Sequence, residues 1–256
     1  MSSGSHISME KVVYPQGWRG TVGLIVPTLF TTHPEHEFRY LFPEGVGLIC
    51  QRVLLDYPNL PLAEALHAMH DSLPNAAYIL KASGADIISF GCTSSSFLKG
   101  REYELHLAAQ IEEASDLPAI TVAAAVADAI RFLRAKKVLL ISPYTTDVNK
   151  QLENYLRDDQ KIGLHFVYEV VSHDKSLTPW QQYRVVLDAC RASPPGADAI
   201  FFSCGATRLV EVIPQLEEET GVPVLSTNLC NVWKCLQTLG IRASVQGKGK
   251  LLEIPK

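Results

Sequence analysis

Two cysteines stand at the ends of two nearly identical segments of the sequence. Segments 85–92 and 197–204 read ADIISFGC and ADAIFFSC, so each opens on Ala-Asp, continues as an apolar run and closes on Cys92 or Cys204. Such a run is typical of a buried parallel strand, and ligands of open α/β sheets bind at the carboxyl ends of strands. If both strand ends face one cleft, two thiols reach one substrate from opposite sides. This arrangement suits proton transfer at carbon, and we predict an enzyme with Cys92 and Cys204 as its catalytic acid and base.

Hydroxyl side chains follow the first cysteine directly. Thr93 and Ser94 open the run TSSS at 93–96. Such donors can hold a carboxylate and stabilise the charge that develops when the adjacent carbon loses a proton or carbon dioxide. The alternative is that 93–96 only cap the following helix. We predict that Thr93 and Ser94 bind the substrate.

Small residues follow the second cysteine. Gly205 and Ala206 come directly after Cys204, before a predicted helix, and we expect their backbone to contribute to substrate binding. A thiol has a pKa near about 8.5, which a helix amino terminus can lower. We expect both cysteines to receive that help from the helices that follow them.

Two further strands repeat and bring more candidates. Segments 22–27 and 138–143 read VGLIVP and VLLISP. Tyr144 follows the second, so its hydroxyl is predicted to point into the cleft. After the first, Pro27 and Thr31 are predicted to line the site, and Thr31 offers a hydroxyl for a carboxylate or, alternatively, a helix cap.

Apolar runs and amphipathic stretches alternate along the chain, which is typical of an α/β protein with a mostly parallel sheet. The predicted strands are 21–26, 46–53, 86–90, 119–122, 137–142, 164–171, 198–203 and 222–225. The predicted helices are 62–82, 100–115, 123–135, 147–158, 179–192, 209–220 and 229–239. Pro74 should kink or divide the first helix.

The repeated segments predict two pseudo-symmetric α/β lobes, each with a mostly parallel sheet, and an active site in the cleft between them. We assign 9–122 to the first lobe, expect 226–256 to join it, and assign 123–225 to the second. Residues 2–6 (SSGSH) have no apolar content, and residues 1–8 are interpreted as an expression scar.

Composition narrows the function classes. The net charge is −4 and no stretch concentrates Lys or Arg, so nucleic acid is not an expected partner. No signal segment or spanning apolar stretch is recognisable, which predicts a cytoplasmic protein with no membrane contact. The six cysteines lack paired metal spacings, and no phosphate-binding glycine loop joins a strand to a helix. We expect no metal and no cofactor, and a homo-oligomer.

Together the motifs resemble one family. The segments that carry the resemblance are 23–27 (GLIVP), 91–97 (GCTSSSF), 143–144 (PY), 147–149 (DVN), 203–205 (SCG) and 221–224 (GVPV). They resemble the aspartate/glutamate racemase superfamily, in particular its maleate cis-trans isomerase and arylmalonate decarboxylase branch. The resemblance covers nearly the whole chain after residue 8. It implies cofactor-free chemistry between two lobes, with Thr93, Ser94, Tyr144 and the backbone after Cys204 holding a substrate carboxylate.

The cysteine pair separates the branches of this family. By resemblance, decarboxylases keep only the second cysteine and carry glycine at the position of Cys92, whereas racemases and maleate isomerases use two. The leading hypothesis is therefore a cofactor-independent racemase or cis-trans isomerase of a small carboxylic or dicarboxylic acid. Phe30 stands where maleate isomerases typically carry asparagine, which counts against a true maleate isomerase. Two alternatives stay open. These are an arylmalonate-type decarboxylase with Cys204 as proton donor and a non-catalytic carboxylate-binding protein.

Overall fold

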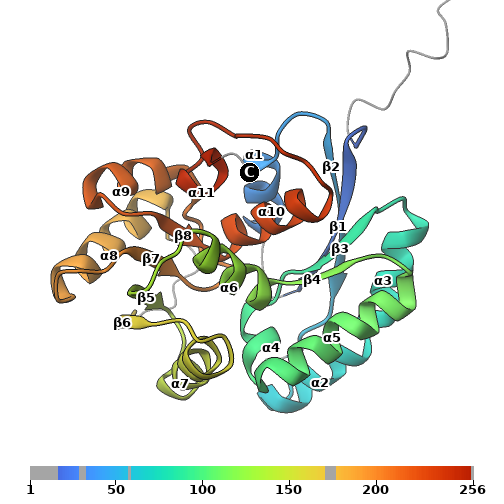
Figure 1. Cartoon of the computed structure of the whole chain (residues 1–256). Helices are drawn as coiled ribbons and strands as arrows, with labels where there is room; N and C mark the ends of the chain where they lie inside the picture. The colour runs from blue at the N-terminus through green and yellow to red at the C-terminus, as the bar shows by residue number, and fades with distance from the viewer. Residues whose placement is uncertain (1–16, 29–32, 57–58, 171–176, 255–256) are drawn as a thin grey trace, which may run out of the picture.

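The chain folds into two halves of the same topology. The computed structural model describes residues 17–28, 33–56, 59–170 and 177–254 (Figure 1). Two four-stranded parallel sheets have the orders β2-β1-β3-β4 and β6-β5-β7-β8. The strands are β1 Gly20–Pro27, β2 Val46–Val53, β3 Ile87–Phe90, β4 Ala119–Thr121, β5 Val138–Ser142, β6 Leu164–Glu169, β7 Ala199–Phe202 and β8 Val224–Ser226. Because the strand order is the same in both sheets, the predicted pseudo-symmetric α/β fold is confirmed.

Helices cover both sheets and fill the space between them. In the first half they are α1 His33–Leu41, α2 Leu62–Asp71, α3 Leu73–Ala82, α4 Thr93–Phe97 and α5 Gly100–Ser115. In the second half they are α6 Val122–Phe132, α7 Thr146–Asn154, the π-helix η2 Tyr155–Asp159, α8 Pro179–Ala192, the 3₁₀ turn η3 Val210–Val212, α9 Ile213–Thr220, α10 Thr227–Thr238 and α11 Lys250–Glu253. Helices α3 and α5 pack on the first sheet, α8 and α9 on the second, and α6 against α10 between them (Figure 1).

Several predicted helix bounds are confirmed, and the short helices α4 and α11 were missed. The helices at 100–115 and 179–192 have the predicted ends, and the stretch 62–82 divides at Ser72 next to Pro74. Helix α4 was not predicted, because five residues rich in serine carry no periodic apolar signal.

The repeated Ala-Asp pair fixes the start of both central strands. Asp86 accepts a hydrogen bond from the Thr21 backbone N–H (2.7 Å) and donates its own N–H to the Thr21 carbonyl (2.9 Å). Asp198 accepts from the backbone N–H groups of Lys136 and Lys137 and donates to the Lys137 carbonyl (2.9 Å). The two aspartates therefore set the same register in both lobes and bring both cysteines to corresponding positions.

Helices α6 and α10 begin in the same way after the last strand of each sheet. Thr121 Oγ1 accepts from the Ala124 N–H, and Ser226 Oγ accepts from the Leu229 N–H, each at 3.2 Å. These hydroxyls satisfy amide groups at the first turn of each helix. Helices α6 and α10 therefore correspond to each other, as the two sheets do.

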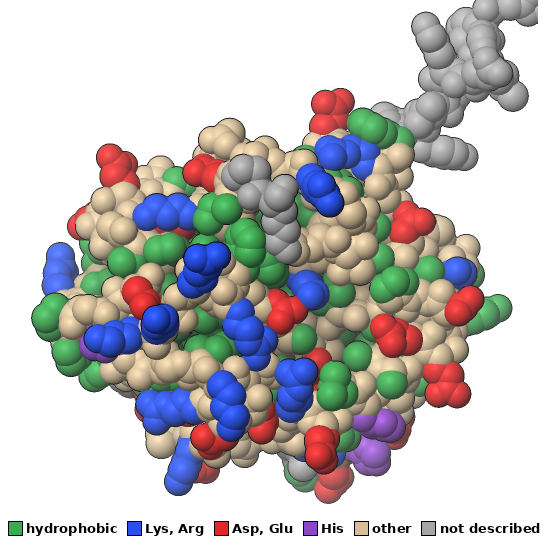
Figure 2. Space-filling model, in the orientation of Figure 1, with side chains coloured by type: hydrophobic (Ala, Val, Ile, Leu, Met, Phe, Trp, Pro, Cys, Tyr) green, Lys and Arg blue, Asp and Glu red, His purple; other side chains and the backbone are tan. Residues whose placement is uncertain are grey.

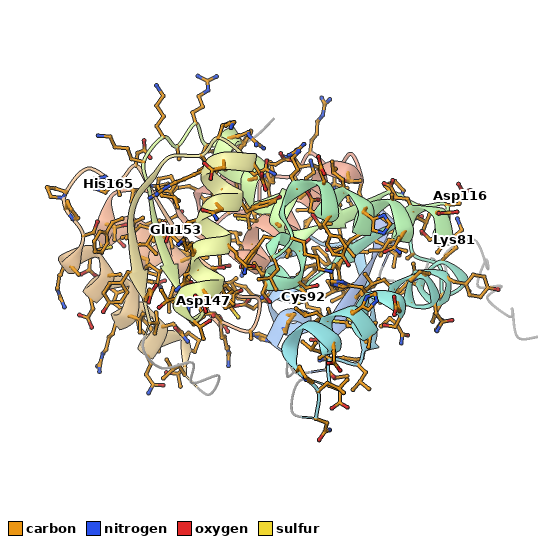
Figure 3. The ribbon with its side chains drawn as sticks, turned by 90° about the horizontal axis from the view of Figure 1, so that it is seen from below. Lys81, Cys92, Asp116, Asp147, Glu153 and His165 are labelled. Atoms are coloured by element: carbon orange, nitrogen blue, oxygen red, sulfur yellow. The ribbon has the colours of Figure 1, made fainter. Side chains whose placement is uncertain are left out.

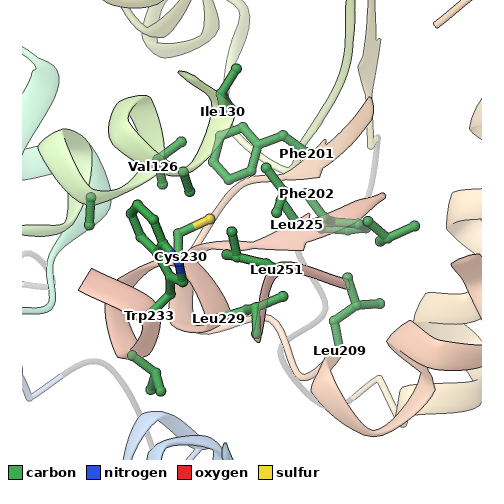
Figure 4. Close-up of a cluster of buried hydrophobic side chains, with 14 of the residues drawn as sticks. Val126, Ile130, Phe201, Phe202, Leu209, Leu225, Leu229, Cys230, Trp233 and Leu251 are labelled. Atoms are coloured by element: carbon green, nitrogen blue, oxygen red, sulfur yellow. The ribbon is translucent and has the colours of Figure 1, made fainter. Parts of the chain in front are cut away.

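A large part of the core lies between α6, α10 and the second sheet (Figure 4). Val126 and Ile130 of α6 and Trp233 of α10 belong to one buried cluster with Phe201 of β7, and the rings of Phe132 and Trp233 are 5.2 Å apart. Helix α10 also packs on β3, β4 and α1 of the first lobe. The lobe boundaries at 9–122, 226–256 and 123–225 therefore stay a prediction.

Charged side chains are scattered over the face of the molecule shown in Figure 2. Figure 2 shows acidic and basic side chains interspersed on one face. No helix within the described ranges is long and apolar enough to cross a membrane.

Candidate active site

The two cysteines occupy corresponding positions, one residue beyond the last ladder bond of β3 and β7. In each lobe the residue before the cysteine donates its backbone N–H to the first strand, at Ile25 (2.9 Å) or Ile141 (2.8 Å). The relative exposures of Cys92 and Cys204 are only 2% and 5%. Both thiols are therefore held at strand carboxyl ends and shielded from bulk water.

This position lies where the two lobes meet. In the view from below, Cys92 is near the middle of the molecule, between His165 on one side and Lys81 and Asp116 on the other (Figure 3). Burial and, as a smaller effect, a charge on Cys204 raise the pKa of Cys92, so the two thiols interact electrostatically. The structure thus brings the two predicted catalytic residues together from different lobes.

Burial decides the protonation state of Cys92. It raises the pKa of this thiol to about 11, although the Ser95 backbone N–H and the hydroxyls of Ser94 and Ser95 act in the opposite direction. The expectation that a helix terminus lowers this pKa is therefore wrong, because a helix of one turn does not offset the loss of water around a thiolate. Cys92 is a protonated thiol near neutral pH.

The segment after Cys204 is a turn and not a helix start. The Thr207 N–H donates to the Cys204 carbonyl (3.1 Å), and helical structure begins only at Val210. The sequence predicted that a helix begins directly after Cys204, but residues 205–209 of the structure form no helix. Cys204 itself has a φ of 94°, in the left-handed region that side chains with a Cβ rarely adopt. Strain of this kind is concentrated at functional sites.

Because the backbone at Cys204 is strained, we expect the glycine variant at this position to be more stable than the alanine variant. Cys204→Gly should have a free energy of unfolding about 1 kcal/mol higher than Cys204→Ala, because relief of about 1–3 kcal/mol of strain outweighs the backbone entropy cost of glycine. Urea denaturation of both variants measures the difference. Equal stability, or a more stable alanine variant, would contradict a strained native backbone at this position.

Tyr144 contacts both halves of the site. Its ring lies 6.0 Å from that of Phe97 in α4. Burial, followed by the charge of Cys204, raises the pKa of the Tyr144 phenol well above its ordinary value, and Cys92 acts in the same direction. The phenol therefore stays protonated and remains a hydrogen-bond donor at the predicted site.

Two buried hydroxyls beside this phenol lack a well-formed partner. Thr93 Oγ1 and Ser203 Oγ have no hydrogen bond to the described part of the chain, although both lie close enough to the Tyr144 phenol to affect its pKa. A buried polar group without a partner costs free energy. The two hydroxyls come from different lobes and, with Tyr144, form a set of donors suited to a carboxylate.

The remaining predicted residues lie around this set. Ser94 is half-buried next to Cys92, Ala206 is buried in the turn after Cys204, and Pro27 is buried at the end of β1. The Pro27 carbonyl accepts from Arg52 Nη1 at 3.4 Å. Thr31 lies outside the described residues, so its predicted role stays a prediction.

A buried carboxyl group supports the Cys204 turn. Glu37 of α1 accepts from the backbone N–H groups of Leu209 (2.8 Å) and Val210 (3.1 Å) and from Asn228 Nδ2 (2.6 Å). The same Asn228 Nδ2 donates to the Gly205 carbonyl (2.9 Å). Glu37 and Asn228 thus connect the first lobe and α10 to the residue after Cys204.

Glu37 should make stability depend on pH. Burial raises its pKa from 4.5 to about 7. Between these values the folded protein keeps a proton that the unfolded chain releases, so stability falls as pH rises, by up to about 3 kcal/mol from this group. Urea denaturation at pH 4.5 and 7.5 should show this loss in the wild type and a smaller loss in Glu37→Gln. Identical pH dependence in both proteins would exclude Glu37 as the source.

The sequence alone did not indicate Ser203, Glu37 or Asn228. Ser203 lies in the repeated segment and was assigned no role, although its place directly before Cys204 could have indicated a site residue. Glu37 and Asn228 lie in helices far from each other in the sequence, and no spacing rule joins them. In the described residues, no group of three or more His, Cys, Asp or Glu side chains is arranged to hold a metal ion.

The fold and this site define a two-lobed α/β protein with one cysteine from each lobe at the junction. A family model described as arylmalonate decarboxylase matches residues 22–252, and the chain belongs to this family. The predicted resemblance is thereby confirmed at the level of the branch.

Named relatives include both a decarboxylase and isomerases. The arylmalonate decarboxylase of Bordetella bronchiseptica is 28% identical over 235 residues, covering 83% of this chain and 95% of the relative. The maleate isomerase of Geobacillus stearothermophilus is 24% identical over 256 residues, covering 90% and 96%. A cysteine-to-serine mutant of the Nocardia farcinica maleate cis-trans isomerase, solved with a covalently bound succinylcysteine intermediate, has a TM-score of 0.80 at 20% identity and covers 91% of this chain and 98% of that one. At 20% identity, this structural similarity shows that the two proteins share a fold.

Proposed function

We propose that this chain is a cofactor-independent isomerase of a small carboxylic or dicarboxylic acid, of the maleate cis-trans isomerase or amino-acid racemase type. The observation that carries the proposal is the pair of buried thiols, Cys92 and Cys204, at corresponding strand ends of two lobes and within electrostatic reach of each other. Two thiols are needed when one group must act on each side of a carbon centre. The maleate isomerases among the relatives support this class.

The substrate carboxylate would lie against the donors that have no partner of their own. Thr93 Oγ1 and Ser203 Oγ are buried without a partner in the described structure, and the Tyr144 phenol, whose pKa both hydroxyls affect, is protonated. Hydrogen bonds to a carboxylate are stronger than those between neutral groups. These donors would also stabilise the enediolate that forms when the adjacent carbon carries negative charge.

In this proposal Cys204 is the nucleophile or base and Cys92 is the proton donor. In isomerisation, the Cys204 thiolate adds to one alkene carbon, and the electron pair of the double bond moves to the other carbon and its carboxylate. Rotation about the resulting single bond and loss of Cys204 regenerate the alkene in the trans form. Cys92, which is protonated at rest, can give a proton to the carbanion and take it back before elimination.

In racemisation the same pair acts by proton transfer alone. The Cys204 thiolate removes the α-proton, the electron pair is held as an enediolate, and the Cys92 thiol delivers its proton to the opposite face. The next turnover in this direction requires a proton to move back from Cys204 and a new proton to reach Cys92. Both reactions use the same two groups, and the substrate decides between them.

A second candidate is decarboxylation of a substituted malonate. It is favoured by the family model and by the 28% identity to a decarboxylase. In this reaction the C–C bond to one carboxylate breaks, carbon dioxide leaves, and Cys204 alone protonates the remaining enediolate. Cys92 would then have no required role.

Proton NMR in deuterated water tests these alternatives together. The enzyme is incubated separately with maleate, with aspartate or glutamate, and with phenylmalonate. We expect fumarate from maleate, or deuterium at the α-carbon of the amino acid with inversion of the centre. Loss of carbon dioxide from phenylmalonate with no reaction of the other substrates would favour the decarboxylase. Ligand-induced thermal stabilisation without any product would favour a binding protein.

A further inference from the structure

A line of hydrogen-bonding side chains runs from Cys92 toward the surface. Cys92 is the N-cap residue of α4, and Ser95 is the third residue of that helix. The Ser95 N–H and hydroxyl lie close enough to the sulfur to lower the pKa of Cys92, against the larger effect of burial. Ser95 Oγ is hydrogen-bonded to His70 Nε2 of α2, and His70 Nδ1 is hydrogen-bonded to the Tyr103 hydroxyl of α5 at 2.8 Å. Three helices therefore bring these groups together.

Burial decreases along this line. The relative exposures of Cys92, Ser95 and His70 are 2%, 1% and 4%, whereas Tyr103 is half-buried. The exposed Lys99 ammonium lies 4.3 Å from the centre of the Tyr103 ring, which marks the solvent end. The line joins a buried thiol to a phenol near the surface.

His70 is neutral in this position. Burial lowers its pKa to about 4, the charges of Lys99 and His67 act in the same direction, and Asp71 opposes them. A neutral imidazole has one donor and one acceptor nitrogen, and here each nitrogen faces a hydroxyl. Its edge-to-face contact with Phe90 at 6.3 Å helps to hold the ring in this orientation.

We infer that Ser95, His70 and Tyr103 form a proton relay that stabilises the Cys92 thiolate and returns protons to it from solvent. The inference rests on the proposed function, in which Cys92 donates a proton during turnover. His70 and Ser95 are positioning residues because they act through the sulfur of Cys92.

In each cycle of the relay, Cys92 gains one proton and water supplies one proton to Tyr103. With Nε2–H donating to Ser95 Oγ, the Ser95 hydrogen points at the thiolate, and the Tyr103 hydrogen points at Nδ1. The Ser95 proton moves to sulfur, the Nε2 proton moves to Ser95, the Tyr103 proton moves to Nδ1, and water replaces the Tyr103 proton. Cys92 is then a thiol and His70 is again neutral, with its proton on the other nitrogen.

The experiment measures how fast Cys92 is alkylated by iodoacetamide between pH 7 and 10, with each cysteine located by mass spectrometry of peptides. The variants are Ser95→Ala, His70→Ala and the double variant, and His67→Gln is the control because His67 is exposed on the same helix. Alkylation of Cys204 in each sample shows whether the active site is intact.

We expect alkylation of Cys92 to slow about tenfold at pH 8 in both single variants, which is the effect of losing one hydrogen bond to a charged group. Without His70 the Ser95 hydroxyl is free to bond to a helix carbonyl, so the double variant should react no more slowly than Ser95→Ala. Imidazole in the buffer should restore the rate in His70→Ala and not in Ser95→Ala. Cys204 in all variants, and both cysteines in His67→Gln, should react at the wild-type rate.

Wild-type alkylation of Cys92 in His70→Ala and Ser95→Ala would overturn the relay. Fully additive effects in the double variant, or equal slowing of Cys204, would also overturn it, since both indicate a general structural change. This readout needs no substrate. A wild type that converts no carboxylate but shows the expected alkylation pattern would therefore refute the proposed function and leave the relay standing.

Discussion

Replacing either Cys92 or Cys204 by serine is expected to lower kcat for isomerisation or racemisation by about 10³-fold. A serine hydroxyl is a much weaker acid than a thiol and a poorer nucleophile, and a positioned acid or base contributes about 10²–10⁴-fold to a rate. Initial rates with the substrate identified by NMR measure the effect. KM should change little, because the carboxylate donors Thr93, Ser203 and Tyr144 remain in place.

The control for this prediction is Cys190→Ser, since Cys190 is a partly buried cysteine in α8 and has no place in the proposed chemistry. It should keep the wild-type rate. Retention of turnover in Cys92→Ser together with its loss in Cys204→Ser would shift the assignment to the decarboxylase, which needs one proton donor. Normal turnover in both cysteine variants would contradict cysteine chemistry altogether.

Tyr144→Phe is expected to lower kcat/KM by about 10²-fold, the effect of removing one donor from a site that stabilises a developing anion. The Tyr144 phenol is kept protonated by burial and by the charge of Cys204, so its hydrogen bond to an enediolate should be available over the whole neutral pH range. Steady-state rates between pH 6 and 9 measure the loss, which should be the same at each pH.

Tyr78→Phe is a suitable comparison because the Tyr78 side chain is 64% exposed in α3. It should have wild-type kinetics. A Tyr144→Phe enzyme with unchanged kcat/KM would show that the phenol only packs against Phe97. Full loss of Cys92 and Cys204 alkylation in the same variant would indicate a disrupted site instead of a lost donor.

The sheet architecture was predictable because the two lobes repeat their strands. Parallel strands buried on both faces give continuous apolar runs, and the Ala-Asp start and cysteine end make the runs at 85–92 and 197–204 easy to match. The aspartates are repeated because each one bonds to the backbone at the start of the neighbouring strand. The positions of the two cysteines could be predicted from this strand register alone, without correct helix bounds.

The details around the cysteines were less predictable because they depend on tertiary contacts. No spacing in the sequence joins His70 to a cysteine, but in the structure His70 reaches Cys92 through Ser95 of α4. The φ of Cys204 and the burial that raises the pKa of Cys92 are properties of the folded chain. Local sequence patterns contain no information on either quantity.

The most direct measurement of the cysteine-pair chemistry is mass spectrometry of protein quenched with acid during turnover of maleate. The variant Cys92→Ser lacks the acid used after the addition and so should allow a covalent intermediate to accumulate, whereas Cys204→Ser lacks the nucleophile that forms it. The account predicts that Cys92→Ser carries one added maleate equivalent on Cys204, which the quenching acid protonates to a succinyl group, and that Cys204→Ser carries none. An adduct on any other cysteine, or unmodified protein in Cys92→Ser while fumarate still forms, would contradict it.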